Sequence, residues 1–172
     1  MTKKKLIILL FGLTLNFSGW TIAKAIQQKG IEEDYRDLSY KSVSDAILET
    51  ESYYKKSLGL PKKLPPLDFT HSFGRFNKEN ENLEIEYLSE KQHFNYIINV
   101  IPSKNETELL SDIDSQVFLK DGTQANYLTS GKDGKSLITF MFKKNNWTYI
   151  LSIEERLLDN PLSTMMEIAN SF

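Results

Sequence analysis

Apolar and polar residues alternate over most of residues 69–153, which is the period of β-strands that have one buried face. The alternation falls into two groups, one before Pro102 and one after residue 115, and short polar stretches separate the runs within each group. Because connections this short join antiparallel neighbours, each group is expected to form a meander of hairpins. The runs are Phe69, His71 and Phe73; Leu83, Ile85 and Tyr87; Phe94, Tyr96, Ile98 and Val100; and residues 116–119, 123–129, 136–142 and 147–153.

Helical spacing appears on either side of the strand region. Ser42 can accept a hydrogen bond from the amide of Asp45, apolar residues then recur at helical intervals, and Gly59 predicts the helix end. Near the C-terminus, Asn160-Pro161 is typical of a capped helix start and precedes an apolar stripe. These patterns predict an α+β fold with a curved antiparallel sheet of about seven strands in two meanders, and with an N-terminal and a C-terminal helix packed on one face.

The N-terminal segment has the three blocks of a secretory signal peptide: lysines at positions 3–5, an apolar stretch over residues 6–15, and small residues at Ala23 and Ala25. Cleavage is expected after Ala25. An alternative keeps residues 6–23 as an uncleaved membrane anchor, and under either interpretation the lysines hold their end in the cytoplasm, so the remaining chain is exported. The predicted organisation is a signal peptide or anchor at 1–25, a polar tether or frayed helix at 26–40, and a single α+β domain at 41–172.

The composition excludes several classes of chemistry. The 172 residues include no cysteine, which excludes thiol catalysis, disulfides, cysteine zinc sites, iron–sulfur clusters and attachment as a lipoprotein. Without the four lysines of residues 1–25, 17 basic side chains remain against 23 acidic ones, a net charge of −6 that argues against nucleic-acid binding. An exported domain without cysteine is typical of bacteria rather than of disulfide-forming secretory systems.

Few residues are candidates for catalysis. Glu84 and Glu86 lie two positions apart on one strand, a spacing compatible with paired carboxylates, but their alternation with apolar residues predicts a solvated strand face. His71 lies between phenylalanines, which favours a hydrogen-bonded core histidine, and His93 is expected at the surface. We therefore predict no catalytic, metal-binding or cofactor-binding residue and expect no cofactor.

Four lysines form a local basic patch in the sequence, Lys55-Lys56 with Lys62-Lys63. Compensation of the helix end and solubility explain such a patch. The alternative is contact with an anionic cell-wall or lipid surface.

Several runs of this chain resemble a domain family of unknown function found in exported or membrane-anchored proteins of Bacillus-like bacteria, sometimes attached to anti-sigma-factor-like regions. The resemblance implies an extracytoplasmic, non-enzymatic domain, and it transfers no catalytic residue. This chain departs from the anchored regulatory members because it has almost no cytoplasmic portion, which argues against a direct sigma-factor role. The runs are Leu60-Pro61-Lys62-Lys63-Leu64-Pro65, Leu83-Glu84-Ile85-Glu86-Tyr87, Trp147-Thr148-Tyr149-Ile150-Leu151-Ser152-Ile153 and Ile168-Ala169-Asn170-Ser171-Phe172.

We therefore expect an exported binding or sensory domain that acts at the bacterial cell envelope, either secreted or anchored with the domain outside. Its expected partner is an envelope ligand or protein, held on the sheet face or on the rim beneath the helices, and it touches the membrane only through an uncleaved N-terminal segment. Two alternatives remain at this point. One is a small envelope hydrolase that uses Glu84, Glu86 or His71, and the other is a carrier of an apolar ligand, which needs an interior cavity.

Overall fold

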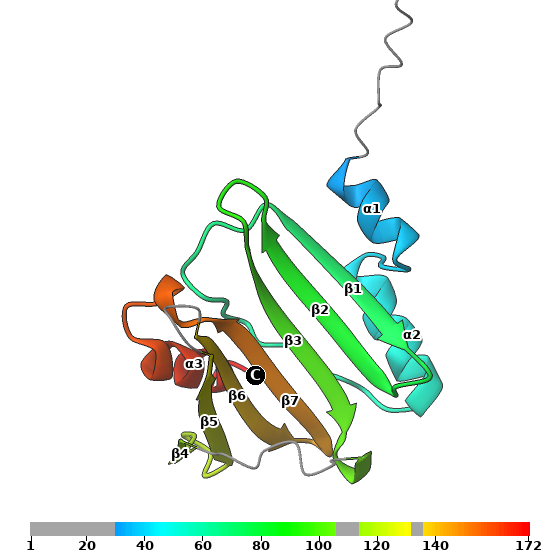
Figure 1. The fold of residues 1–172 in the computed structure, drawn as a ribbon. Coiled ribbons are helices and arrows are strands. Elements are labelled where there is room, and N and C mark those ends of the chain that lie inside the picture. Colours follow the sequence, from blue (N-terminus) through cyan, green and yellow to red (C-terminus); the bar gives the residue numbers. More distant parts are fainter. Residues whose placement is uncertain (1–29, 106–113, 132–135) are drawn as a thin grey trace, which may run out of the picture.

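Seven antiparallel strands form one open sheet in the computed structural model, which describes residues 30–105, 114–131 and 136–172 (Figure 1). The strand order is β1-β2-β3-β7-β6-β5-β4. The predicted α+β class and the two meanders are therefore confirmed. The strands are β1 (His71–Asn77), β2 (Asn82–Ser89), β3 (Phe94–Pro102), β4 (Ser115–Phe118), β5 (Gln124–Ser130), β6 (Leu137–Lys144) and β7 (Trp147–Glu154).

One pairing joins the two meanders, that of β3 with β7 at the centre of the sheet. Ile98 of β3 lies opposite Leu151 of β7, which in turn lies opposite Phe140 of β6. Since the side chains of directly paired residues share a face, these three residues form one row across the middle of the core.

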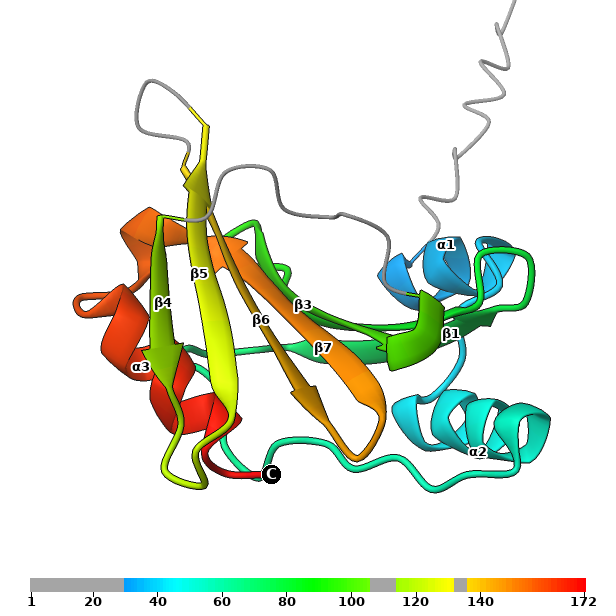
Figure 2. The same cartoon turned by 90° about the horizontal axis from the view of Figure 1, so that it is seen from below.

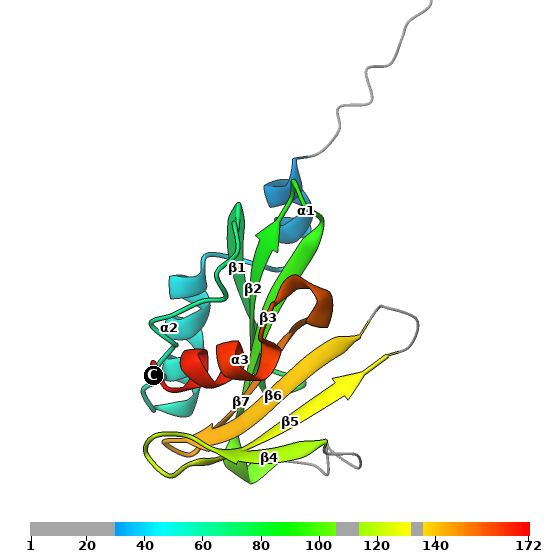
Figure 3. The ribbon, with the colours of Figure 1, turned by 90° about the vertical axis from the view of Figure 1, so that its left-hand side faces the viewer.

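Two helices cover one face of the sheet, as the sequence predicts (Figure 3). Helix α2 (Val43–Tyr54) packs on β1 and β2, and helix α3 (Pro161–Ala169) lies over the second meander. Between the helices and the sheet, the largest side chains are fully buried and belong to one core. The fully buried large residues are Trp147, Tyr96, Tyr149, Phe140, Phe142, Leu83, Ile85, Ile98, Ile138, Leu151, Ile153 and Met165.

Helix α2 begins as predicted but ends earlier. The Ser42 hydroxyl accepts a hydrogen bond from the amide of Asp45 at 3.1 Å. The left-handed residue that ends the helix is Lys55, with φ of 53°, and not Gly59. Strand β7 explains the difference, because Trp147 Nε1 donates to the Ser57 carbonyl at 2.9 Å and the Tyr149 hydroxyl donates to the Gly59 carbonyl at 3.0 Å. The chain after Lys55 is thus tied to the sheet instead of continuing the helix.

Helix α3 starts with proline at its first position, as predicted, but Asn160 caps it differently from the expectation. The Asn160 side chain makes no cap hydrogen bond, and its backbone carbonyl accepts from the amide of Thr164 at 3.0 Å. Proline at the first turn has no amide to satisfy, so the helix start needs fewer side-chain acceptors.

A short helix, α1 (Ile31–Asp37), lies on the face of the sheet opposite α2 (Figure 2). It falls within residues 26–40, where the sequence predicts a polar tether or a frayed helix. The Tyr35 ring stacks on Phe73 of β1 with centroids 4.1 Å apart, and Lys41 then pairs with Gly74 through two backbone hydrogen bonds of 2.9 Å. Residues 30–41 are therefore part of the packed structure.

Candidate functional site

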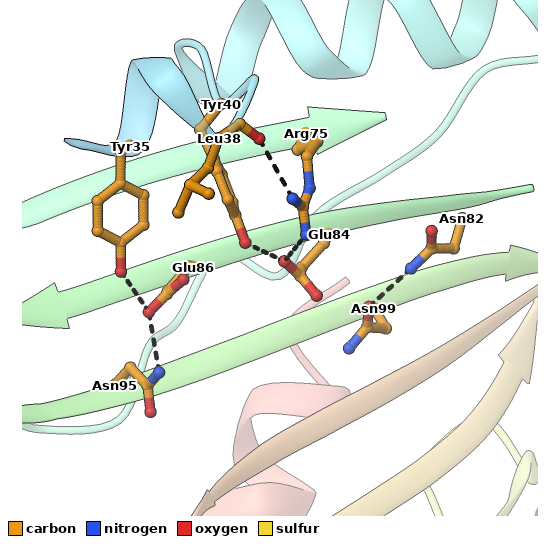
Figure 4. Close-up of polar contacts among 9 residues, drawn as sticks. All are labelled: Tyr35, Leu38, Tyr40, Arg75, Asn82, Glu84, Glu86, Asn95 and Asn99. Atoms are coloured by element: carbon orange, nitrogen blue, oxygen red, sulfur yellow. Dashed lines mark hydrogen bonds and ion pairs between the residues drawn. The ribbon is translucent and has the colours of Figure 1, made fainter. Parts of the chain in front are cut away.

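The two glutamates singled out from the sequence lie beneath α1. Glu84 and Glu86 of β2 point to the face opposite the core, as predicted, but Glu86 is buried there and Glu84 is only partly exposed. Only 6% of Glu86 is exposed. The expectation of a solvated strand face is wrong here because α1 and the turn after it cover the carboxylates (Figure 4).

Glu86 is held by donors from both sides. The Tyr35 hydroxyl donates to Glu86 Oε1 at 2.7 Å, and the Asn95 amide of β3 donates to the same oxygen at 2.8 Å. A buried carboxylate needs such partners, because desolvation without them is costly. The Tyr35 side chain is thus held twice, because its ring stacks on Phe73 and its hydroxyl binds Glu86.

Glu84 binds both a tyrosine and an arginine. It accepts a hydrogen bond from the Tyr40 hydroxyl, and its Oε1 lies 3.2 Å from Arg75 Nη2. The Arg75 guanidinium lies over the Tyr40 ring, 4.4 Å from the centroid, and donates through Nη1 to the Leu38 carbonyl at 3.2 Å. A single arginine of β1 therefore connects the carboxylate, the tyrosine ring and the backbone that follows α1 (Figure 4).

Tyr35 and Tyr40 remain protonated at neutral pH and can therefore donate hydrogen bonds to the carboxylates. Burial, the hydrogen bond to Glu86 and the nearby negative charge raise the pKa of Tyr35 well above its usual value. Burial and the hydrogen bond to Glu84 do the same for the pKa of Tyr40. Because protonated tyrosines donate and ionised carboxylates accept, the geometry suits the attachment of α1 to the sheet. We refer to Tyr35, Tyr40, Arg75, Glu84 and Glu86 as the α1 docking cluster.

His71 makes its contacts with Thr70 and Phe73. Its Nδ1 is 2.8 Å from the Thr70 hydroxyl, and its ring stacks on Phe73 with centroids 5.9 Å apart. No hydrogen bond among the described residues joins it to Glu84 or Glu86. The hydrogen bond expected for His71 is present and the side chain is half-buried, but its placement in the core is wrong. Strand β1 begins at His71 and turns it to the outer face, while Phe69 packs towards the core from the segment before the strand.

Other sequence candidates have the following positions. His93 is exposed in the β2–β3 turn, as predicted. The four lysines expected as one patch have different contacts, since Lys63 pairs with Glu167 at 3.3 Å whereas Lys56 lies over the Trp147 ring. Within the part of the chain that the structure describes, no group of three histidine or acidic side chains is arranged to hold a metal ion.

Sequence reasoning missed the donors of the α1 docking cluster. Tyr35 and Tyr40 are separated by a polar stretch and show no helical periodicity, so no local pattern marks them. The two tyrosines themselves are the available sequence signal. A tyrosine hydroxyl that becomes buried needs a hydrogen-bond acceptor, and Glu84 and Glu86 are acidic residues within a strand that is otherwise apolar.

The predicted signal residues Ala23 and Ala25 lie outside the described residues. Among the described helices, none is long and apolar enough to cross a membrane.

Comparison of the chain with protein-family models, with curated proteins and with solved structures finds no match. The resemblance of residues 60–65 and 147–153 to a family of exported bacterial domains therefore stays a prediction.

Replacing Tyr35 by phenylalanine is expected to loosen α1 while preserving the stacking on Phe73. The loss of one hydrogen bond to a charged acceptor should cost about 1–2 kcal/mol of local stability. Limited trypsin digestion checks this, because Arg36 and Lys41 flank the turn after α1 and should be cut faster in Y35F. Tyr53→Phe is the control, since Tyr53 is 48% exposed and should tolerate the change. Equal cutting of Y35F and the wild type would contradict the docking role.

Alkaline pH is expected to destabilise the fold from about pH 10 upwards. Burial raises the pKa of Tyr96 above its usual range and that of Tyr149 to about 12, whereas unfolded tyrosines ionise near 10. The unfolded state therefore loses protons first, so this stability is complete below pH 10 and decreases above it. Thermal unfolding between about pH 8 and pH 11 measures the effect. Tyr96→Phe should flatten the decrease, and an unchanged profile in that variant would contradict the assignment.

Proposed function

We propose that the protein is an exported, non-enzymatic binding or sensory domain that acts at the bacterial cell envelope. The observation that carries this proposal is the α1 docking cluster. Both carboxylates that a small envelope hydrolase would use are engaged by Tyr35, Tyr40 and Arg75, so they serve to attach α1 to the sheet.

The position of α1 supports a link between export and the folded domain. The predicted leader ends at Ala25, and α1 begins at Ile31, only a few residues later. If the leader is retained as an anchor, α1 connects the outer face of β1 and β2 to the anchored segment. If it is cleaved, α1 becomes the first element of the exported domain.

The packing of the core favours binding at the surface over carriage of an apolar ligand inside. Phe140, Leu151 and Met165 are fully buried between the sheet and its helices. At their positions the interior is filled by side chains.

Two experiments test the proposal. The first expresses the full chain in a Gram-positive host and follows it with an antibody in medium, membrane and cytosol. We expect it outside the cytosol, and recovery of the intact chain only from the cytosol would contradict export. Replacing Ala23 and Ala25 by arginine should prevent cleavage of the leader and shift secreted chain to the membrane fraction.

The second experiment measures binding and turnover together. The exported protein is sedimented with washed cell-envelope fragments, and the same fragments are analysed for released glycan or ester products. We expect co-sedimentation without products, and the double variant Glu84→Gln with Glu86→Gln should leave the envelope substrates equally intact. Products that appear with the wild type and disappear with this variant would establish the hydrolase alternative instead.

A further inference from the structure

A pocket of about 480 Å³ opens at one end of the sheet, where three distant segments meet. The segments are the end of α2, the end of β3 with the short helix η1 (Ser103–Asn105), and the β6–β7 turn. In Figure 1 the end of β3 and the β6–β7 turn lie together at the bottom of the sheet. A recess of this volume is within the range of sites for small ligands.

Two aromatic side chains, Trp147 and Tyr54, form part of the pocket wall. Trp147 is fixed by its hydrogen bond to the Ser57 carbonyl, and its ring meets Tyr54 of α2 edge-on with centroids 5.2 Å apart. The left-handed turn at Lys55 brings Lys56 over this ring, with Nζ 4.6 Å from the centroid. The Lys56 ammonium is therefore positioned at the pocket by the packing around it, and partial burial lowers its pKa.

Two lysines make the described lining of the pocket positively charged. Lys56 and Lys104 both line it, and no aspartate or glutamate does so among the described residues. By contrast, Lys41, Lys63 and Lys144 each lie within 3.3 Å of a carboxylate oxygen. On a chain with a net charge of −2, two lysines in one recess, with no acidic side chain among its described lining residues, favour an anion as the ligand.

Two further side chains supply hydrogen-bonding groups. The Ser103 hydroxyl accepts from Thr148 at 3.2 Å, which leaves its own proton to be donated. Asn146 is exposed in the β6–β7 turn, and its backbone carbonyl accepts from the Ser103 amide at 3.1 Å, so the two loops are held together. Hydroxyl and amide groups beside two ammonium groups suit a ligand that combines negative charge with alcohol groups.

We propose that this pocket binds a phosphate-bearing polyol, such as one glycerol phosphate unit of an anionic polymer. The lining favours phosphate because ammonium groups contact phosphate oxygens as point charges from several directions, whereas the paired recognition of carboxylates is typical of arginine, which is absent from the lining. The concave shape favours a single polymer unit over a flat membrane surface. The inference rests on the proposed function and names the ligand class of the binding domain.

Calorimetric titration of the exported protein tests the inference. The probes are glycerol phosphate oligomers, inorganic phosphate and glycerol, with vesicles of phosphatidylglycerol in a separate arm. We expect the oligomers to bind and glycerol not to bind, and affinity should decrease as salt is added. The double variant Lys56→Gln with Lys104→Gln should weaken oligomer binding by about tenfold or more. The matched control is Lys91→Gln with Lys120→Gln, which removes the same charge at exposed positions outside the pocket.

A second variant keeps the test independent of folding effects. Asn146→Asp places a negative charge at the pocket and retains a residue that tolerates the positive φ of 60° at this position, so the fold should persist while oligomer binding is lost. Unchanged binding by both pocket variants, equal binding of glycerol, or binding to vesicles alone would overturn the inference. If the protein sediments with envelope fragments while both pocket variants do so equally well, the pocket assignment fails and the proposed function stands.

Discussion

Replacing Leu151 by alanine is expected to lower the free energy of unfolding by about 2–5 kcal/mol, the range for large-to-small changes in a closed core. Leu151 is fully buried on β7 and lies between Ile98 and Phe140 in the row that crosses the sheet. Among the described strands, only β3 and β7 pair across the two meanders, so a cavity at this position weakens the contact between the two halves of the sheet. Equilibrium unfolding in urea measures the change.

Ser152→Ala is the control for this prediction, because Ser152 is the next residue of β7 and faces the opposite side of the sheet, where it is partly exposed. Its effect should stay within about 0.5 kcal/mol. Similar losses for the two variants would show that the row through Leu151 is not the centre of the core.

Gly74→Ala is expected to destabilise the protein by about 1–3 kcal/mol through overpacking. A Cβ at Gly74 would lie 2.7 Å from the Ala46 Cβ and 3.1 Å from the Val43 Cα of α2, so the helix would have to move away from β1. The movement should expose Phe76, which lies under the same helix. Urea unfolding gives the stability, and a lower helical signal in circular dichroism would report the displacement of α2.

Gly59→Ala is the matched control, because a Cβ there meets no atom within 4 Å. Adding a methyl group at such a site restricts mainly the unfolded chain, so stability should be unchanged or rise by about 0.4–1 kcal/mol. The two substitutions are chemically identical and should differ in sign. A stable Gly74→Ala variant would mean that α2 can pack on β1 at a greater distance without loss.

The sequence predicts the strands and the covered face well because these features depend on local alternation. The run from Phe94 to Val100 and the run from Trp147 to Ile153 each place every second residue in the core, and the structure confirms both. The order of the strands could not be predicted in the same way, since nothing local to β3 indicates that β7 is its second neighbour.

Long-range hydrogen bonds explain the remaining differences. The end of α2 depends on Trp147 and Tyr149, whose side chains bind carbonyls 90 positions earlier in the chain. Docking of α1 likewise depends on Tyr35 and Glu86, which are 51 positions apart. Local propensity contains no information on these contacts, so Gly59 predicted the wrong helix end and Glu86 the wrong environment.

The candidate binding pocket shows the same limit. The sequence places Lys56 in a basic patch with its neighbours in the chain, whereas the fold groups it with Lys104 and Asn146 from two other segments. The positive charge of Lys56 can be predicted from the residue type. The shape of the pocket cannot, because it depends on how α2 packs against the β6–β7 turn.

The backbone pairing of Lys41 with Gly74 has a consequence for how the molecule behaves among its copies. An open sheet has two outer strands, and unpaired amides and carbonyls on such strands can recruit a strand from another molecule, which is how fibrils grow. Here the segment after α1 occupies backbone groups of β1, while β4 at the other border has only four residues. Growth by strand addition is thus opposed at both borders by features of the chain itself.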